Sequence, residues 1–326
     1  MTLTLTALPL QISARVTNPI HLNEHKGSAI RGALFHALRK RSCARLELAS
    51  CHPCELVPVC PISALVATVD PEWDRGADPP RPLVVEPPLD PRTEYRSGDC
   101  LEFGLTVFGS AGRLLPYLVL AVGDAGKAGL GRRYQRDGLW TDGRFEVERI
   151  ELASPFCEES EVLYPAGEGQ AIFRSPRKAV TDADVQAALE PTADTVTLDF
   201  VTPTRLISRG ERLPTFELAP FLQRLRERLE ALESRYGQAR VTEPLFDAAA
   251  IAAELRVTTD STRWCDVRSF SHRQKQAMPV GGFVGSVTLS GNLAPVLPFL
   301  AWGQLTHVGK NATKGNGAYR LRFQPA

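Results

Sequence analysis

The chain contains one pattern twice, and this duplication constrains its fold more than any other feature. Cys100 to Arg133 reads as an alternating strand, a Gly-Ser-Ala-Gly turn, an apolar helix and then three glycines. Gly285 to Arg320 follows the same course with a Ser-Gly-Asn turn. Similarity of this kind within one chain indicates a repeated supersecondary unit. A chain of 326 residues is long enough for two domains of ordinary size.

Hydrophobic periodicity predicts the rest of a βαββαβ unit around each copy. Apolar residues at i, i+3, i+4, i+7 and i+8 predict the first helix over Ser28–Lys40. Alternation predicts strands at Leu3–Val16, Pro82–Glu86, Cys100–Phe108, Phe145–Leu152, Thr195–Thr202, Arg263–Phe270, Phe283–Leu289 and Ala318–Phe323, and the other helices are expected at Arg113–Val122, Leu218–Tyr236 and Leu293–Leu305.

This order predicts an α+β chain of two tandem ferredoxin-like (RRM-like) domains, each with two helices on one face of an antiparallel sheet. A doubly wound α/β fold fits less well, because its parallel strands are buried on both faces whereas these strands alternate. We expect an N-terminal domain over 1–154, a connection rich in Pro and Gly over 155–194, and a C-terminal domain over 195–326.

A Cys-rich insertion is expected in the first domain, in the loop 43–60. Its spacing is Cys-x7-Cys-x2-Cys-x5-Cys, formed by Cys43, Cys51, Cys54 and Cys60. Four thiolates with one Cys-x-x-Cys pair could close a tetrahedral structural zinc site. An iron–sulfur cluster or four reduced thiols remain alternatives. A disulfide framework is not expected in a chain of this length.

Charge is segregated along the chain. Residues 1–50 contain seven Lys and Arg against two Asp and Glu, and residues 261–326 contain eight against one, although the whole chain has a net charge of only +1. Two basic ends favour a partner that is a polyanion such as nucleic acid. No apolar run is long enough for a membrane span and no signal peptide is evident, so we expect a cytoplasmic protein without a membrane partner.

A glycine-rich loop over 309–317 joins the last helix to the last strand. Gly309, Gly315 and Gly317 allow positive φ and close approach of another backbone, while Lys310 and Lys314 offer charge to a phosphate chain. The loop is not a P-loop, because no Gly-Lys-Ser/Thr opens a helix. It is not a dinucleotide fingerprint either, because a strand follows the glycines. No other cofactor fingerprint for a small-molecule enzyme is found.

The order and spacing of several motifs resemble the CRISPR-associated endoribonucleases of the RAMP superfamily that process precursor CRISPR RNA. Most of them lie in the last fifth of the chain, one lies on the first predicted helix, and the middle of the chain matches only in layout. The motifs are Ser271–Gln274, Met278–Gly285, Ser290–Leu293, His307–Lys310, Gly315–Arg320 and, on the helix, Lys26–Leu34.

The resemblance implies metal-independent cleavage within the repeat of the RNA, by attack of a 2′-hydroxyl on its own 3′-phosphate. The products would be a 2′,3′-cyclic phosphate and a 5′-hydroxyl. Expected partners are the CRISPR repeat RNA and other CRISPR effector subunits. The alternative is a non-catalytic RAMP-type subunit that only holds guide RNA. No cofactor is expected for catalysis, apart from structural zinc at the cysteines.

The reaction asks for a base, an acid and positive charge, and histidine suits both proton transfers near neutral pH. His36 matches the catalytic histidine that the family often has on or after the first helix. The helical wheel places it away from the apolar stripe, beside Gly32 and Lys40.

His307 and Lys310, at the glycine loop, are the other catalytic candidates; His21 and His25 stay open. The residues expected to bind RNA are Arg31, Arg39, Lys40, Arg273, Lys275, Gly309, Lys314, Gly315 and Gly317.

Overall fold

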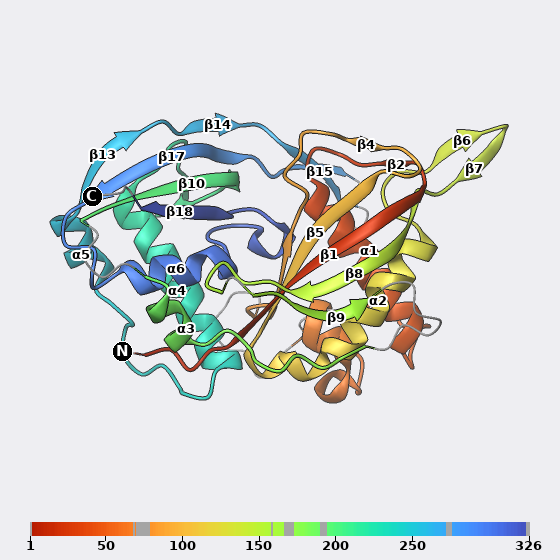
Figure 1. The fold of residues 1–326 in the computed structure, drawn as a ribbon, viewed down its shortest axis with the longest axis horizontal. Coiled ribbons are helices and arrows are strands. Elements are labelled where there is room, and N and C mark those ends of the chain that lie inside the picture. The colour runs from red at the N-terminus through yellow and green to blue at the C-terminus, as the bar shows by residue number, and fades with distance from the viewer. Residues whose placement is uncertain are drawn as a thin grey trace. The chain divides into compact units, whose positions relative to one another are not determined.

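The computed structural model of the protein (Figure 1) describes residues 2–67, 69, 79–157, 159–165, 173–189, 194–271 and 276–323. The chain forms two compact units. We call Ala7–Ala179 the N-terminal domain, and Val180–Ala326 together with Met1–Thr6 the C-terminal domain.

The N-terminal domain is built on a five-stranded antiparallel sheet in the order β3-β5-β1-β8-β9. Its strands are β1 (Ala7–Asn18), β3 (Leu83–Glu86), β5 (Cys100–Phe108), β8 (Arg144–Leu152) and β9 (Glu161–Pro165). Helices α1 (Lys26–Ser42) and α2 (Leu115–Ala128) pack against each other and on this sheet. Without the edge strand β9, the four strands have the order of a ferredoxin-like domain.

The C-terminal domain repeats this order in the sheet β13-β17-β10-β18, in which β14 also pairs with β17. Its strands are β10 (Thr195–Thr204), β13 (Arg256–Asp260), β14 (Arg263–Cys265), β17 (Gly282–Ser290) and β18 (Tyr319–Phe323), and its helices are α3 (Asp182–Ala187), α4 (Leu218–Tyr236), α5 (Ala248–Glu254) and α6 (Leu297–Thr306). The rings of Phe200, Phe221 and Tyr319 meet in its core. The expected fold of two tandem ferredoxin-like domains is therefore confirmed.

Four short antiparallel ribbons complete the described strands. They are β2 (Ile20–His21) with β4 (Glu94–Tyr95), β6 (Tyr134–Arg136) with β7 (Leu139–Thr141), β11 (Ile207–Ser208) with β12 (Glu211–Arg212), and β15 (Arg268–Ser271) with β16 (Gln276–Pro279). Strands of two or three residues are too short for periodicity to predict. The elements β9, α3, α5 and β13 were not predicted either, and β9 and α3 lie within 155–194, where a connection was expected. The strand expected at Arg263–Phe270 is divided between β14 and β15.

The first strand starts later than its alternating pattern suggests. Leu3 and Leu5 are buried, but β1 begins at Ala7 because the residues before it belong to the C-terminal domain. The backbone N–H groups of Thr4 and Leu5 donate to the buried carboxylate of Glu233 in α4. None of the helices in the described part of the chain is long and apolar enough to cross a membrane.

Candidate functional site

The exposed face of α1 presents three of the residues singled out in the sequence. His36 and Lys40 are exposed, one turn apart, while Ile30, Leu34 and Leu38 of the opposite face are buried. A side chain at Gly32 would meet no atom within 4 Å. The helix therefore places an imidazole between open space on one side and a cation on the other, as its periodicity predicts.

The two arginines of α1 that were expected to bind RNA, Arg31 and Arg39, bind the protein itself. Arg31 is half-buried and donates to the carbonyl of Val66 at 2.7 Å. Burial, with repulsion from Arg81, lowers the pKa of Arg31 to about 10. Arg39 donates to the carbonyls of Leu46 and Leu48. Of the three cations Arg31, Arg39 and Lys40, Lys40 is thus the most exposed.

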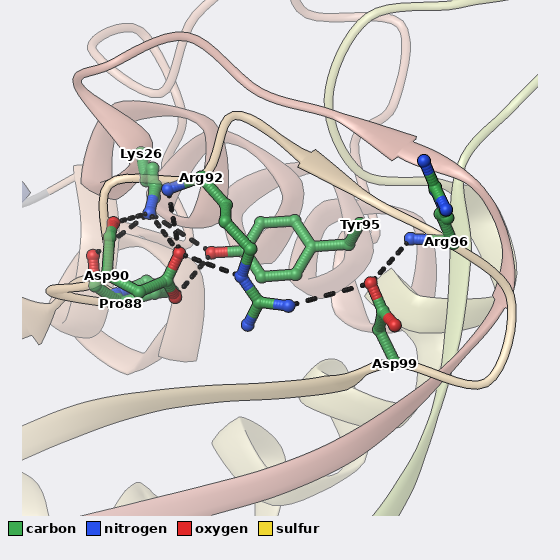
Figure 2. Close-up of polar contacts among 7 residues, drawn as sticks. All are labelled: Lys26, Pro88, Asp90, Arg92, Tyr95, Arg96 and Asp99. Carbon is green, nitrogen blue, oxygen red and sulfur yellow. Dashed lines mark hydrogen bonds and ion pairs between the residues drawn. The ribbon is translucent and has the colours of Figure 1, made fainter.

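A buried lysine anchors the N-terminal end of α1 (Figure 2). Lys26 is 3% exposed, and its ammonium donates to the carbonyl of Asp90 and, at 3.1 Å, to the hydroxyl of Tyr95. It also lies 3.3 Å from the Asp90 carboxylate. Arg92 stacks over the Tyr95 ring with its guanidinium carbon 4.7 Å from the ring centroid.

Electrostatics explain why this cluster holds together. Burial lowers the pKa of Lys26, and the attraction of Asp90 opposes that shift. Burial acts to raise the pKa of Asp90, but hydrogen bonds from Tyr95 and Arg92 outweigh it and hold that pKa below its usual value. A buried charge is tolerated when it is paired and hydrogen-bonded. The cluster therefore fixes the start of the helix whose exposed face presents His36.

The glycine loop of the C-terminal domain has the backbone that its sequence predicts. Gly309, Gly315 and Gly317 have φ of 89°, 93° and 74°. A side-chain carbon at Gly309 would lie 2.5 Å from the carbonyl oxygen of Arg205, and one at Gly317 would lie 1.9 Å from that of Val308. Positive φ and close backbone contact both require glycine at these positions.

Many backbone donors in and beside the loop are used within the domain. The N–H groups of Val308, Lys310, Lys314, Gly315, Asn316 and Gly317 all donate to carbonyl groups within the domain. The loop is therefore held rigidly. Its lysine side chains are groups able to meet a phosphate. Lys310 is exposed and Lys314 is half-buried.

The structure places the remaining histidine candidates differently from His36. His307 follows α6 with φ of 55° and is 0% exposed. His25 is buried beside Ser28, with Nδ1 2.7 Å from the serine hydroxyl. His21 lies 3.5 Å from Glu94 at the ribbon β2–β4. Two expected RNA contacts, Arg273 and Lys275, lie outside the described residues.

The four cysteines of the Cys-rich segment lie between α1 and β3, all half-buried and reduced. Burial raises the pKa of Cys51, and the thiols of Cys60, Cys43 and Cys54 raise it further by repulsion. Cys51 thus lies near the other three thiols. Within the described residues, no group of three or more His, Cys, Asp or Glu stands in a metal-binding arrangement. The zinc site stays a prediction.

A feature missed in the sequence is the hairpin formed by β6 and β7, which projects from the sheet and helices of the N-terminal domain in Figure 1. The turn Asp137-Gly138 between two short strands is the strongest local signal for a hairpin and could have revealed it. Arg136, Leu139 and Trp140 beside this turn are exposed.

Comparison with known families identifies the chain. Residues 5–177 match the model AF_1859_N, described as an N-terminal domain, and residues 198–319 match the model of the CRISPR-associated endoribonuclease Cas6. The chain belongs to the AF_1859_N family and is Cas6-like. The resemblance seen in its sequence motifs is confirmed. No curated protein matches this Cas6-like chain.

Solved Cas6 structures share the fold of this Cas6-like chain. A Cas6 product complex matches with a TM-score of 0.55 and 16% identity, over 97% of this chain and 99% of the other. Cas6 of Thermus thermophilus gives 0.52 and 15%, again over 97% and 99%. A partial Cas6-RT-Cas1–Cas2 complex gives 0.54 and 15%, over 98% of this chain and 46% of that longer one.

Proposed function

We propose that the chain is a metal-independent endoribonuclease that cleaves precursor CRISPR RNA within the repeat. The match of residues 198–319 to the Cas6 endoribonuclease model supports an RNA-cleaving enzyme that processes CRISPR RNA. The observation that supports a catalytic site on this chain is the row of Gly32, His36 and Lys40 on α1, in which His36 and Lys40 are exposed. This row combines a proton-transfer group, a cation and room for a backbone to approach.

In the reaction we propose, the attacking oxygen and the leaving oxygen both belong to the RNA. The 2′-oxygen next to the scissile phosphate attacks phosphorus while a base removes its proton. The bond from phosphorus to the 5′-oxygen then breaks, and an acid protonates that oxygen. The products are a 2′,3′-cyclic phosphate and a 5′-hydroxyl. The nucleophile belongs to the substrate, so no metal-bound water is required.

In this proposal His36 exchanges a proton with the reacting oxygens and Lys40 contacts a neighbouring phosphate. Histidine is suited to this role because its ordinary pKa lies near neutral pH. Lys310, on the glycine loop of the other domain, is proposed as a further phosphate contact because it is exposed on a rigid backbone. We assign His307 a packing role, because its ring is completely buried.

Other CRISPR proteins are proposed as partners. One structural relative is part of a Cas6-RT-Cas1–Cas2 complex, in a chain of which the present sequence covers 46%. That observation supports association with CRISPR proteins in general. The particular partner of this chain is to be found by co-purification.

The decisive experiment is incubation of the purified chain with a repeat hairpin RNA, labelled at its 5′ end, in the presence of EDTA. We expect one cut within the repeat, a 2′,3′-cyclic phosphate detected by mass spectrometry, and the same rate with and without EDTA. Tight binding without cleavage would favour a subunit that only holds guide RNA. Cleavage that requires added Mg²⁺ would contradict the mechanism.

A further inference from the structure

The hairpin β6–β7 is a stiff, exposed arm. Its strands pair from Tyr134 with Thr141 to Arg136 with Leu139, so that Asp137 and Gly138 alone form the turn. Both turn residues have positive φ, 52° and 76°, as a type I′ turn requires. Such a turn matches the twist of the strands and fixes their register.

The base of the hairpin is fastened to the N-terminal domain. The N–H of Arg132 donates to the carbonyl of His21 at 2.8 Å, and the N–H of Leu130 donates to that of Gly143 at 2.8 Å. The rings of Tyr134 and His21 meet edge to face with centroids 4.9 Å apart. The arm therefore projects from a fixed root.

The tip presents apolar groups that the fold does not use. Trp140 is 61% exposed and Leu139 is 73% exposed, whereas Trp302 in the core is 0% exposed. An exposed indole is costly in water and is often retained where it meets a ligand. Because Trp140 pairs with Gln135, strand alternation places it on the face of Arg133, which forms a 3.1 Å ion pair with Asp142.

The charge of the arm favours an anionic ligand. Residues 131–144 contain four arginines against two aspartates. Arg136 lies on the opposite face from Trp140, paired with Leu139. Arginines interleaved with an exposed aromatic ring are typical of surfaces that bind single-stranded nucleic acid, where bases stack and cations meet phosphates. A purely apolar protein contact would not need this density of cations.

The duplication provides an independent argument. Arg132 follows Gly131, which has φ of 88°, and its N–H binds the carbonyl of His21. In the C-terminal domain Lys310 follows Gly309, which has φ of 89°, and its N–H binds the carbonyl of Arg205 at 3.0 Å. The two domains thus present an exposed cation at equivalent points.

We propose that the β6–β7 hairpin binds unpaired nucleotides of the RNA substrate, with a base stacked on Trp140 and phosphates contacted by Arg132 and Arg136. This assignment rests on the proposed function, because it gives the RNA-processing enzyme a contact to the single-stranded part of its substrate. Stacking needs an unpaired base, so a fully paired stem is not expected to use the arm.

The test measures RNA affinity by fluorescence anisotropy with three labelled probes. They are the repeat hairpin with single-stranded flanks, the same hairpin without flanks, and an unstructured RNA of about 12 nucleotides. Trp140→Ala should weaken binding of the flanked and unstructured probes about 5- to 150-fold and leave the bare hairpin unchanged. Trp140→Phe should retain most of the wild-type affinity. Tyr117→Ala, which removes another exposed aromatic ring from the same domain, is the matched control.

Each outcome separates this inference from the proposed function. Unchanged affinity of Trp140→Ala for the unstructured RNA, with cleavage intact, would overturn the inference alone. Trp140-dependent binding of unstructured RNA by a chain that cleaves no repeat would support the inference and contradict the proposed function. If sedimentation shows that Trp140→Ala abolishes self-association and RNA affinity stays the same, the tip is a protein contact and the inference is wrong.

Discussion

The two domains share one backbone contact between a glycine and a carbonyl, which we call the clamp, but the chain that follows this contact differs between them. In each, a glycine with positive φ follows a helix, α2 or α6, and lies against a carbonyl that follows a strand, β1 or β10. A side-chain carbon at Gly131 would lie 2.3 Å from the carbonyl oxygen of His21, and one at Gly309 would lie 2.5 Å from that of Arg205. A side chain at either glycine would collide with backbone. The clamp therefore belongs to the shared fold rather than to a site of one domain.

The chain beyond the clamp differs between the domains. After Gly131 it extends into the exposed hairpin β6–β7, whereas after Gly309 it turns back into a partly buried loop that ends at Gly317. Duplication thus preserves what packing requires. Segments that extend into solvent are free to acquire different contacts. Substitutions in either domain can test whether function divides between the domains in the same way.

The largest effect is expected at His36, on the N-terminal domain. His36→Ala should lower the single-turnover cleavage rate ~10² to 10⁴-fold, because a positioned general acid or base is lost. RNA affinity should hardly change, because phosphate charge dominates binding. His52→Ala, another exposed histidine, is the control. If His36→Ala cleaves at the wild-type rate, His36 is not the proton-transfer group.

Glycine substitutions should separate the partly buried loop from the exposed hairpin. Gly317→Ala forces a side chain to 1.9 Å from a carbonyl oxygen at φ of 74°, whereas Gly138→Ala has a similar φ of 76° and open space. The left-handed conformation alone costs about 1–2 kcal/mol, and overpacking adds about 1–3 kcal/mol. Calorimetry of the full chain should show the larger loss of melting temperature for Gly317→Ala. Equal losses would mean that the loop relaxes freely.

The lysines of the glycine loop should contribute to binding through charge. Lys310→Ala with Lys314→Ala should weaken RNA binding and reduce the slope of log K against log salt by about 1.4 to 1.8, if each lysine meets one phosphate. Arg113→Ala with Lys127→Ala removes two exposed cations from the N-terminal domain as a control. Identical salt slopes for wild type and the loop variant would place the RNA elsewhere.

The smallest effect on cleavage is expected from the cysteine segment. We predict about one zinc per chain from a tetrahedral site of four cysteines. Its removal by a chelator should leave the cleavage rate unchanged, because the proposed reaction uses no metal. Elemental analysis of untagged protein is the measurement. Neither zinc nor iron in the purified chain would contradict the site, and Cys51→Ser is the matched variant.

The sequence predicted well the parts of the molecule that depend on local pattern. Helix α4 has the expected ends, Leu218 and Tyr236, because its leucines recur at helical spacing among charged residues. The solvent exposure of His36 followed from its angle to the apolar stripe of α1. The positive φ of Gly309 and Gly317 followed from glycines placed between a helix and a strand.

Only the tertiary structure decided how individual polar groups are used. Arg31 and Arg39 look like free cations in the sequence, but their guanidinium groups donate to backbone carbonyls, that of Arg31 to Val66, 35 residues away along the chain. Lys26 looks like a surface lysine and is buried against Asp90 and Tyr95, which lie more than 60 residues away along the chain. Periodicity determines which side of an element faces the core, whereas the partner of a charged group depends on long-range contacts.

The burial of His307 and the hairpin β6–β7 were not predicted from the sequence either. The sequence placed His307 beside a glycine loop, but the packing of α6 buries its ring completely. Periodicity could not predict β6–β7, because each strand has three residues and only the Asp137-Gly138 turn marks it. Local sequence therefore determined the order of helices and strands and the need for glycine. The three-dimensional packing of both domains decided which of the candidate side chains remain available to a substrate.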